Sequence, residues 1–228
     1  MDWARAIERN SEALKGIVDV LFAMLGLDGT DRVARIPQTL HRAVLRVLRP
    51  AESALRRLVV IAARGLVVKL APSRPMPARP IGKGRLSRPS FQLFDPRKNF
   101  AALYQNRRMA TRNPPRIHIF GSDPRVVALW SAPQPLADPT PPPDGLVDAA
   151  RLSRRLQALE FALADLLRQA RRLARWRLKQ ANAKAPKFRS PLRPGPPPGH
   201  RKRPVHEVDG VLTECHGLAR DALRLDTS

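Results

Sequence analysis

The distribution of proline constrains this chain more than any other feature of its sequence. Of its 24 prolines, fifteen fall in residues 72–145 and seven in residues 186–204. The other two lie in residues 1–71, and residues 146–185 contain none. Proline lacks a backbone donor and breaks helix interiors, so we expect helices in the proline-poor blocks and extended connections in the other two. The predicted fold class is therefore mainly α.

Five segments follow from this division of the 228 residues. Large Pro/Arg-rich parts of the chain are expected to be disordered, because they offer too few apolar residues for a core. The segments are a small helical N-terminal domain (1–71), a Pro/Arg-rich, mostly disordered linker (72–145), a long amphipathic or coiled-coil-like helix (146–185), a basic Pro/Gly-rich linker (186–210) and a short amphipathic C-terminal helix (211–228).

The N-terminal domain is expected to contain three helices. The first is predicted to begin after Asp2, a good N-cap, and to stop near Gly26. The second is predicted to begin at Pro37, since proline suits a first turn. Pro50 is expected to end or kink this helix and to open the third helix, which runs to about Ala71. That third helix is apolar nearly all round, which predicts burial at the centre. So short a domain is marginally stable alone, and self-association or docking of a later helix would help.

Residues 146–185 carry the clearest periodic pattern in the chain. Leucines occupy most heptad a and d positions along a helix seam, and Ala149 and Ala170 occupy the other two a positions. The seam leucines are Leu152, Leu156, Leu159, Leu163, Leu166 and Leu173. A coiled coil and a helix packed on the N-terminal domain both fit this pattern. Phe161, Leu167 and Trp176 lie off the seam and are expected to widen the buried face.

The positive charge of the chain indicates an anionic partner. The sequence holds 42 Lys and Arg against 19 Asp and Glu, a net charge of +23. Such a chain attracts nucleic acid, anionic lipid and acidic protein. Residues 72–185 carry +15 of this charge. Arginine outnumbers lysine 34 to 8, a bias that a GC-rich genome would also produce, so the sequence leaves open whether the charge is functional.

The densest group of cations lies on the C-terminal half of the seam helix. This candidate polyanion-binding cluster consists of Arg168, Arg171, Arg172, Arg175, Trp176, Arg177 and Lys179. The cations suit phosphate contacts, and the indole is available for base stacking or for insertion into an interface. Nucleic acid, an anionic membrane surface or an acidic protein are the candidate ligands, and a merely solvated helix end is the alternative to all three.

A second candidate is an aromatic motif inside the long linker. Phe91, Phe94, Phe100 and Tyr104 alternate with arginine and lysine residues. Such a mixture grips single-stranded nucleic acid, or folds on a protein partner as a docking motif, or forms a strap across the protein's own helices. We favour the docking motif and the strap together. Residues 117–130 further along the linker have the pattern of a short hairpin.

No set of residues predicts an active site. The spacings of His200, His206, Cys215 and His216 match no short metal-binding pattern, and a single cysteine excludes an intramolecular disulfide. The basic loop at residues 81–85 lacks the spacing of a phosphate-binding loop. We therefore expect no enzymatic activity, no metal or other cofactor and no small-molecule substrate.

The chain resembles a known group in four stretches, which are residues 1–7, 49–58, 94–97 and 168–177. They resemble a family of uncharacterised alphaproteobacterial proteins with no assigned function. The resemblance implies a bacterial, cytoplasmic setting and no functional residue. No secretory signal is apparent, and the most apolar runs are shorter than the ~20 residues of a membrane-spanning helix.

Together these features predict a non-enzymatic helical interaction or adaptor protein with a basic disordered middle. It would act through a protein partner or through self-association. One alternative is a nucleic-acid-binding protein that uses the Arg-rich helix 168–179. The other is a peripheral membrane protein that binds anionic lipid through the helix at residues 55–71 and the same cluster.

Overall fold

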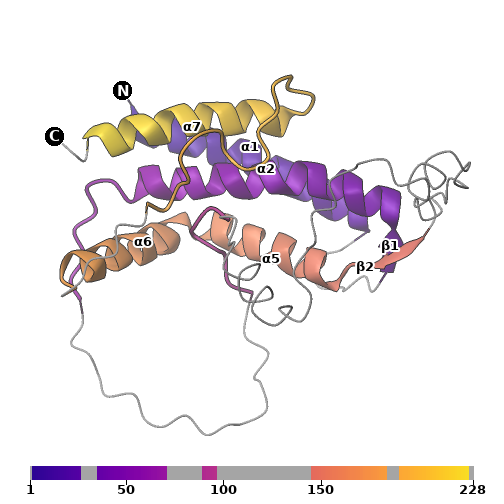
Figure 1. Ribbon diagram of the computed structural model, residues 1–228, viewed down its shortest axis with the longest axis horizontal. Coiled ribbons are helices and arrows are strands. Elements are labelled where there is room, and N and C mark those ends of the chain that lie inside the picture. The colour runs from indigo at the N-terminus through magenta and orange to yellow at the C-terminus, as the bar shows by residue number, and fades with distance from the viewer. Residues whose placement is uncertain (1, 27–34, 71–88, 97–144, 184–189, 226–228) are drawn as a thin grey trace, which may run out of the picture. The chain divides into compact units, whose positions relative to one another are not determined.

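The computed structural model describes residues 2–26, 35–70, 89–96, 145–183 and 190–225. These residues form mostly helix (Figure 1), which confirms the mainly α prediction. The helices are α1 (Trp3–Leu25), α2 (Gln38–Ala62), α5 (Ala150–Ala164), α6 (Leu166–Ala181) and α7 (Glu207–Leu225), and the strands are β1 (Arg35–Pro37) and β2 (Leu146–Asp148). The two strands pair antiparallel, with Ile36 opposite Val147.

Helix α2 lies at the centre of these elements and contacts all four other helices. Figure 1 shows α7 along one side of α2 and the α5–α6 pair along the other. Every residue from Ser53 to Ile61 is buried, as its nearly all-round apolar sequence predicts. The structure differs from the expected separate N-terminal domain, because α5, α6 and α7 belong to the same compact unit as α1 and α2. A helix that is apolar on every side needs neighbours on every side, and α1 alone cannot supply them.

The ends of α1 lie where the sequence places them. The carboxylate of Asp2 accepts a hydrogen bond from the backbone N–H of Arg5 at 3.1 Å, as an N-cap does. Gly26 ends the helix in the left-handed conformation, with φ of 61°, and its N–H bonds back to the last turn. Both predicted helix boundaries are confirmed.

Helix α2 continues through Pro50, which corrects the prediction of two helices separated there. Proline has no N–H, so the carbonyl of Arg46 loses its usual partner four residues on. The guanidinium of Arg201 donates to that carbonyl at 3.3 Å. Gly199 lies directly against the proline, since a Cβ on Gly199 would come within 2.7 Å of the Pro50 nitrogen. A contact from far along the chain therefore closes the gap that proline leaves in the helix.

The end of α2 also differs from the prediction. The helix stops at Ala62 rather than near Ala71. Gly65 follows with φ of 67°, a left-handed conformation that a continuing helix cannot contain. The residues from Leu66 to Leu70 are not helical.

Residues 190–206, expected to be part of a linker, pack against the helices. Leu192 is buried in the core, and Gly199 contacts Pro50 as described above. Helix α7 begins at Glu207, four residues before the predicted start at residue 211. Its first turn is capped by Asp209, whose carboxylate accepts hydrogen bonds from the N–H groups of Val205 and His206.

The long helix expected over residues 146–185 is divided in two. Residues 146–148 form β2, and the helix breaks at Asp165, whose φ of −134° and ψ of 70° are not helical. The Asp165 side chain accepts a hydrogen bond from the N–H of Arg168 and so caps α6. Aspartate competes with the backbone in this way and favours helix starts over helix interiors.

The leucine seam faces the core of this chain. Leu166 is half-buried, and the other five seam leucines are buried. Helix α5 contacts α1 and α2, and α6 contacts α2. Of the two alternatives that the heptad pattern left open, the structure has the helix packed on the N-terminal helices. Phe161 and Leu167, expected to widen the buried face, are instead each 49% exposed.

Candidate functional site

A short extended segment, Pro89–Pro96, crosses the surface of the helices, and we call it the strap. Its Phe91 and Leu93 side chains are buried in the core. Phe94 meets the indole of Trp176 edge to face, with 4.8 Å between ring centroids. Two members of the predicted docking motif therefore pack on the protein's own helices. The other two, Phe100 and Tyr104, lie outside the described residues, as does the hairpin expected at residues 117–130.

Arginines from two helices bind the backbone of the strap. From α2, the Arg56 Nε donates to the carbonyl of Gln92 at 3.0 Å, and its guanidinium lies 5.5 Å from the centre of the Phe91 ring. From α6, Arg172 donates to the carbonyl of Phe91 at 2.8 Å. Charged donors make stronger hydrogen bonds than neutral ones, so these contacts fix the strap in place.

The strongest attachment of the strap is the buried carboxylate of Asp95. Arg57 Nη2 lies 3.0 Å from Asp95 Oδ2, and neither side chain is exposed. Asp95 also accepts a hydrogen bond from the N–H of Arg193 and forms a longer ion pair with Arg56, at 3.8 Å. Burial lowers the pKa of Arg57 and the charge of Asp95 opposes that change. This carboxylate therefore joins the strap, α2 and the segment before α7.

Another donor of Arg57 contacts a histidine on α7. Arg57 Nε donates to His216 Nδ1 at 3.2 Å, which requires a neutral imidazole with its proton on Nε2. Burial and the charge of Arg57 lower the pKa of His216. Burial raises the pKa of the neighbouring Cys215 to about 12, so that thiol is not reactive at neutral pH. His200 and His206 are exposed, and no cluster of three or more metal-ligating residues occurs in the described part of the chain.

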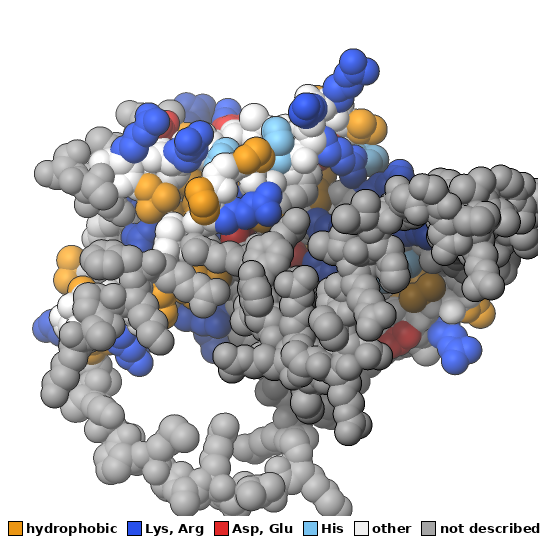
Figure 2. All heavy atoms as spheres, viewed as in Figure 1, with side chains coloured by type: hydrophobic (Ala, Val, Ile, Leu, Met, Phe, Trp, Pro, Cys, Tyr) orange, Lys and Arg blue, Asp and Glu red, His pale blue; other side chains and the backbone are white. Residues whose placement is uncertain are grey.

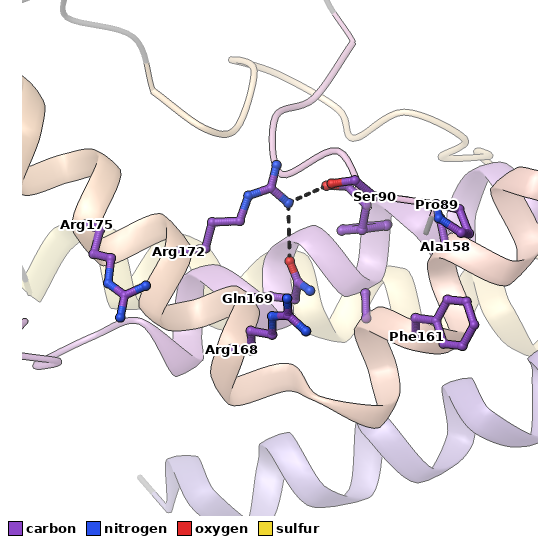
Figure 3. A pocket seen from close by; sticks show the side chains of 10 residues that line it. Pro89, Ser90, Ala158, Phe161, Arg168, Gln169, Arg172 and Arg175 are labelled. Atoms are coloured by element: carbon purple, nitrogen blue, oxygen red, sulfur yellow. Dashed lines mark hydrogen bonds between the residues drawn. The ribbon is translucent and has the colours of Figure 1, made fainter. Parts of the chain in front are cut away.

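A hollow of about 630 Å³ lies between the strap and the α5–α6 pair, and we call it the cationic groove. In Figure 3, Arg168, Arg172 and Arg175 all project from α6 along this hollow. The other lining residues are Gln169 of α6, Ala158, Phe161 and Ala162 of α5, and Pro89, Ser90 and Phe91 of the strap. Within the groove lining, the only ionisable side chains are the three guanidiniums, so the hollow attracts anions.

A second hollow of about 440 Å³ shares strap residues with the first. Pro89, Ser90 and Phe91 line both, as does Ala158. The second hollow adds the exposed Arg151 and Arg154 of α5, together with Arg155, which is paired with Glu52 by hydrogen bonds of 2.9 and 3.0 Å. Cations therefore line the helices on both sides of the first strap residues.

The structure divides the predicted polyanion-binding cluster into two groups. Arg168, Arg171, Arg172, Arg175 and Lys179 are exposed, and Arg172 also binds the strap. Trp176 packs against Phe94, and Arg177 is half-buried. Positions 168, 172, 175 and 179 share one face of α6, as the helical repeat requires. The sequence did not single out Ser90, Gln169, Arg151 or Arg154, because nothing in their spacing shows which helices the strap crosses.

Of residues 55–71, expected to form a helix that lies on a membrane, the part that is helical is enclosed by protein. The part that is helical ends at Ala62, and Leu55, Leu58 and Ile61 are buried in the core. Trp176, the other apolar element of that interpretation, contacts Phe94 instead. In the described part of the chain, no helix combines the length and the apolar character that crossing a membrane requires.

Comparison with known proteins does not assign a family to this chain. No family model matches it, and neither does any curated protein or solved structure.

Proposed function

We propose that this chain is a non-enzymatic interaction protein that binds an acidic segment of a partner protein in the cationic groove. The observation that carries the proposal is the set of three guanidiniums on one face of α6, opposite the strap. Guanidinium groups pair with carboxylates through two parallel hydrogen bonds, which gives direction as well as charge. A peptide rich in glutamate or aspartate has the matching chemistry.

An exposed aromatic ring in the same wall favours a protein segment as the ligand. Phe161 lines the groove and is 49% exposed. Aromatic and arginine side chains are enriched at the residues that dominate binding energy in protein interfaces. An acidic segment that also carries one apolar side chain would use both features.

Single-stranded nucleic acid is favoured less by this arrangement. Stacking of successive bases relies on several exposed aromatic faces. Among the residues that line the groove only Phe161 offers one, because Phe91 is buried and Trp176, outside the lining, contacts Phe94 of the strap. The volume of about 630 Å³ lies in the range of pockets that hold a few side chains or a small ligand. These features support a short peptide over an extended polynucleotide.

The residue types that line the groove support binding rather than catalysis. Its ionisable lining residues are all arginines, a residue type outside the usual general acids and bases. General acid–base chemistry needs a group that gains and loses a proton near the working pH. The rigid attachment of the strap through Arg56, Arg57 and Asp95 suits a binding surface, because a wall ordered in advance costs less entropy on association.

Fluorescence anisotropy with the full chain tests this proposal. The probe is a fluorescein-labelled octapeptide of alternating glutamate and leucine, and a peptide with glutamine in place of glutamate is its control. We expect the double variant Arg168→Glu/Arg175→Glu to bind the acidic peptide at least tenfold more weakly. The double variant Lys202→Glu/Arg203→Glu makes the same change in net charge at a surface outside the groove, and we expect it to retain binding.

Two results would contradict the proposal. Equal losses in both double variants would mean that net charge, and not the groove, attracts the peptide. Tighter binding of a single-stranded RNA of equal charge, weakened by Arg168→Glu/Arg175→Glu and falling steeply with salt, would favour the nucleic-acid alternative instead.

A further inference from the structure

A second cationic surface lies where the segment before α7 crosses α2, and it shares no residue with the groove. Arg42, Arg46 and Arg49 are exposed on α2 at spacings of four and three residues, so they lie along one face. Lys202 and Arg203 are exposed on the crossing segment. We call these five residues the basic patch. In the part of the chain that the structure describes, none of the five side chains forms an ion pair.

The crossing segment is fixed to α2 by specific contacts. Arg201 donates to the carbonyl of Arg46 at 3.3 Å, and Gly199 packs directly on Pro50. The Arg201 guanidinium also lies 3.8 Å from the carboxylate of Asp209, which caps α7. These contacts hold Gly199 and Arg201, which lie just before Lys202 and Arg203 in the chain, against the part of α2 that carries Arg46 and Arg49.

Exposed aliphatic side chains adjoin the basic patch. Val205, two residues after Arg203, is 72% exposed. The next residue, His206, lines a mainly apolar hollow of about 170 Å³ together with Val20 and Met24 of α1, which are themselves 59% and 38% exposed. In Figure 2, Lys and Arg side chains project at the upper right over the segment before α7, with hydrophobic and histidine side chains beside them.

We propose that the basic patch and Val205 bind the surface of an anionic membrane. Cations beside exposed aliphatic groups suit the lipid interface, where phosphate and carboxylate headgroups meet the first methylene groups of the acyl chains. A polynucleotide backbone would engage the cations but has no contact to offer an exposed valine. The hollow is also lined by the acidic residue Glu207, but its single negative charge is outweighed by the five positive charges of the basic patch. This inference is independent of the groove.

Vesicle co-sedimentation with the full chain tests the proposal. The probes are vesicles of phosphatidylcholine alone and vesicles with about one third phosphatidylserine, at physiological salt. We expect binding only to the anionic vesicles. Each cation near such a surface contributes roughly fivefold to binding, so Lys202→Glu/Arg203→Glu should weaken partition by at least twenty-five-fold. Val205→Ser, a change at an exposed position without charge, should weaken it by roughly threefold to tenfold.

The double variant Arg168→Glu/Arg175→Glu is the matched control, because it changes the net charge equally at the groove. Retained vesicle binding by this variant supports the basic patch. Equal losses in both double variants, no effect of Val205→Ser, or binding to single-stranded RNA but not to anionic vesicles would each overturn the proposal. Both double variants are measured with the acidic peptide and with the anionic vesicles. A loss of peptide binding at the groove can therefore be distinguished from a loss of lipid binding at the basic patch.

Discussion

Replacing Asp95 by asparagine is expected to destabilise the protein strongly. The substitution keeps the size of the side chain and removes the negative charge beside Arg57, which is 0% exposed, and Arg56, which is 5% exposed. Arg57 would keep its hydrogen bonds to Ser53 and His216 but would lose its counter-ion, while Arg56 would keep its ion pair with Glu52. Breaking a buried pair in this way costs about 3–5 kcal/mol. For a protein of this size that corresponds to a fall in Tm on the order of 10 °C.

Urea unfolding followed by circular dichroism at 222 nm measures this loss. The control is Arg9→Gln, which removes an exposed ion pair with Glu214 and should change the free energy of unfolding by less than ~1 kcal/mol. A double-mutant cycle of Asp95→Asn with Arg57→Met isolates the pair, and we expect the double variant to lose less than the sum of the two single variants. Additive losses, or an Asp95→Asn effect no larger than that of Arg9→Gln, would refute the reasoning.

Two further predictions follow from contacts made by the segment before α7 and by α7 itself. Gly199→Ala places a Cβ within 2.7 Å of the Pro50 nitrogen in a backbone with φ of 85°, whereas Gly195→Ala, at φ of 81°, meets open space. We expect Gly195→Ala to cost about 1–2 kcal/mol and Gly199→Ala clearly more, and equal losses in urea unfolding would contradict the close packing. The second concerns pH, because folding lowers the pKa of His216 from its ordinary value of 6.5. Above pH 6.5 the histidine is neutral in both states and costs no stability. As the pH falls below 6.5, the unfolded chain takes up the proton before the folded protein does, so the free energy of unfolding decreases. His216→Gln should flatten this part of the stability curve, and an unchanged slope in urea titrations between pH 7 and pH 5 would exclude the burial of His216 beside Arg57 as its cause.

The elements that the sequence predicts correctly depend on contacts between near neighbours. Asp2 caps the first turn of α1 three residues away, and Gly26 ends that helix through its own backbone freedom. The helical repeat likewise shows which leucines share a face of α5 and α6. These features need no knowledge of the rest of the fold.

The errors have two sources, which are contacts with distant parts of the chain and a local signal that a second pattern concealed. Pro50 is compatible with a continuous helix because Arg201 satisfies the carbonyl that it leaves unpaired. Asp165 divides a long helix because its own side chain caps the next one, a local signal that the uninterrupted heptad pattern concealed. The extent of the ordered segment before α7 was missed because proline and glycine suit a linker as well as a packed, extended chain.

The same distinction applies to the candidate site. The sequence determines that the chain is strongly positive and that cations gather on residues 168–179. It cannot determine that Arg172 binds the strap and that Trp176 packs against Phe94, which leaves Arg168, Arg171 and Arg175 exposed. Nor does it show that Arg201 donates to the backbone of α2 at Arg46.

The sequence by itself therefore determined the helical character, the face that each helix buries and the sign of the charge, because these follow from residue type and from the helical repeat. Only the tertiary structure decided which of three interpretations of Phe91 and Phe94 holds and which arginines remain exposed. A guanidinium is free or engaged according to whether a carboxylate or carbonyl lies within hydrogen-bonding distance. For Arg57 that partner is Asp95, 38 residues away along the chain, and no local pattern encodes the contact.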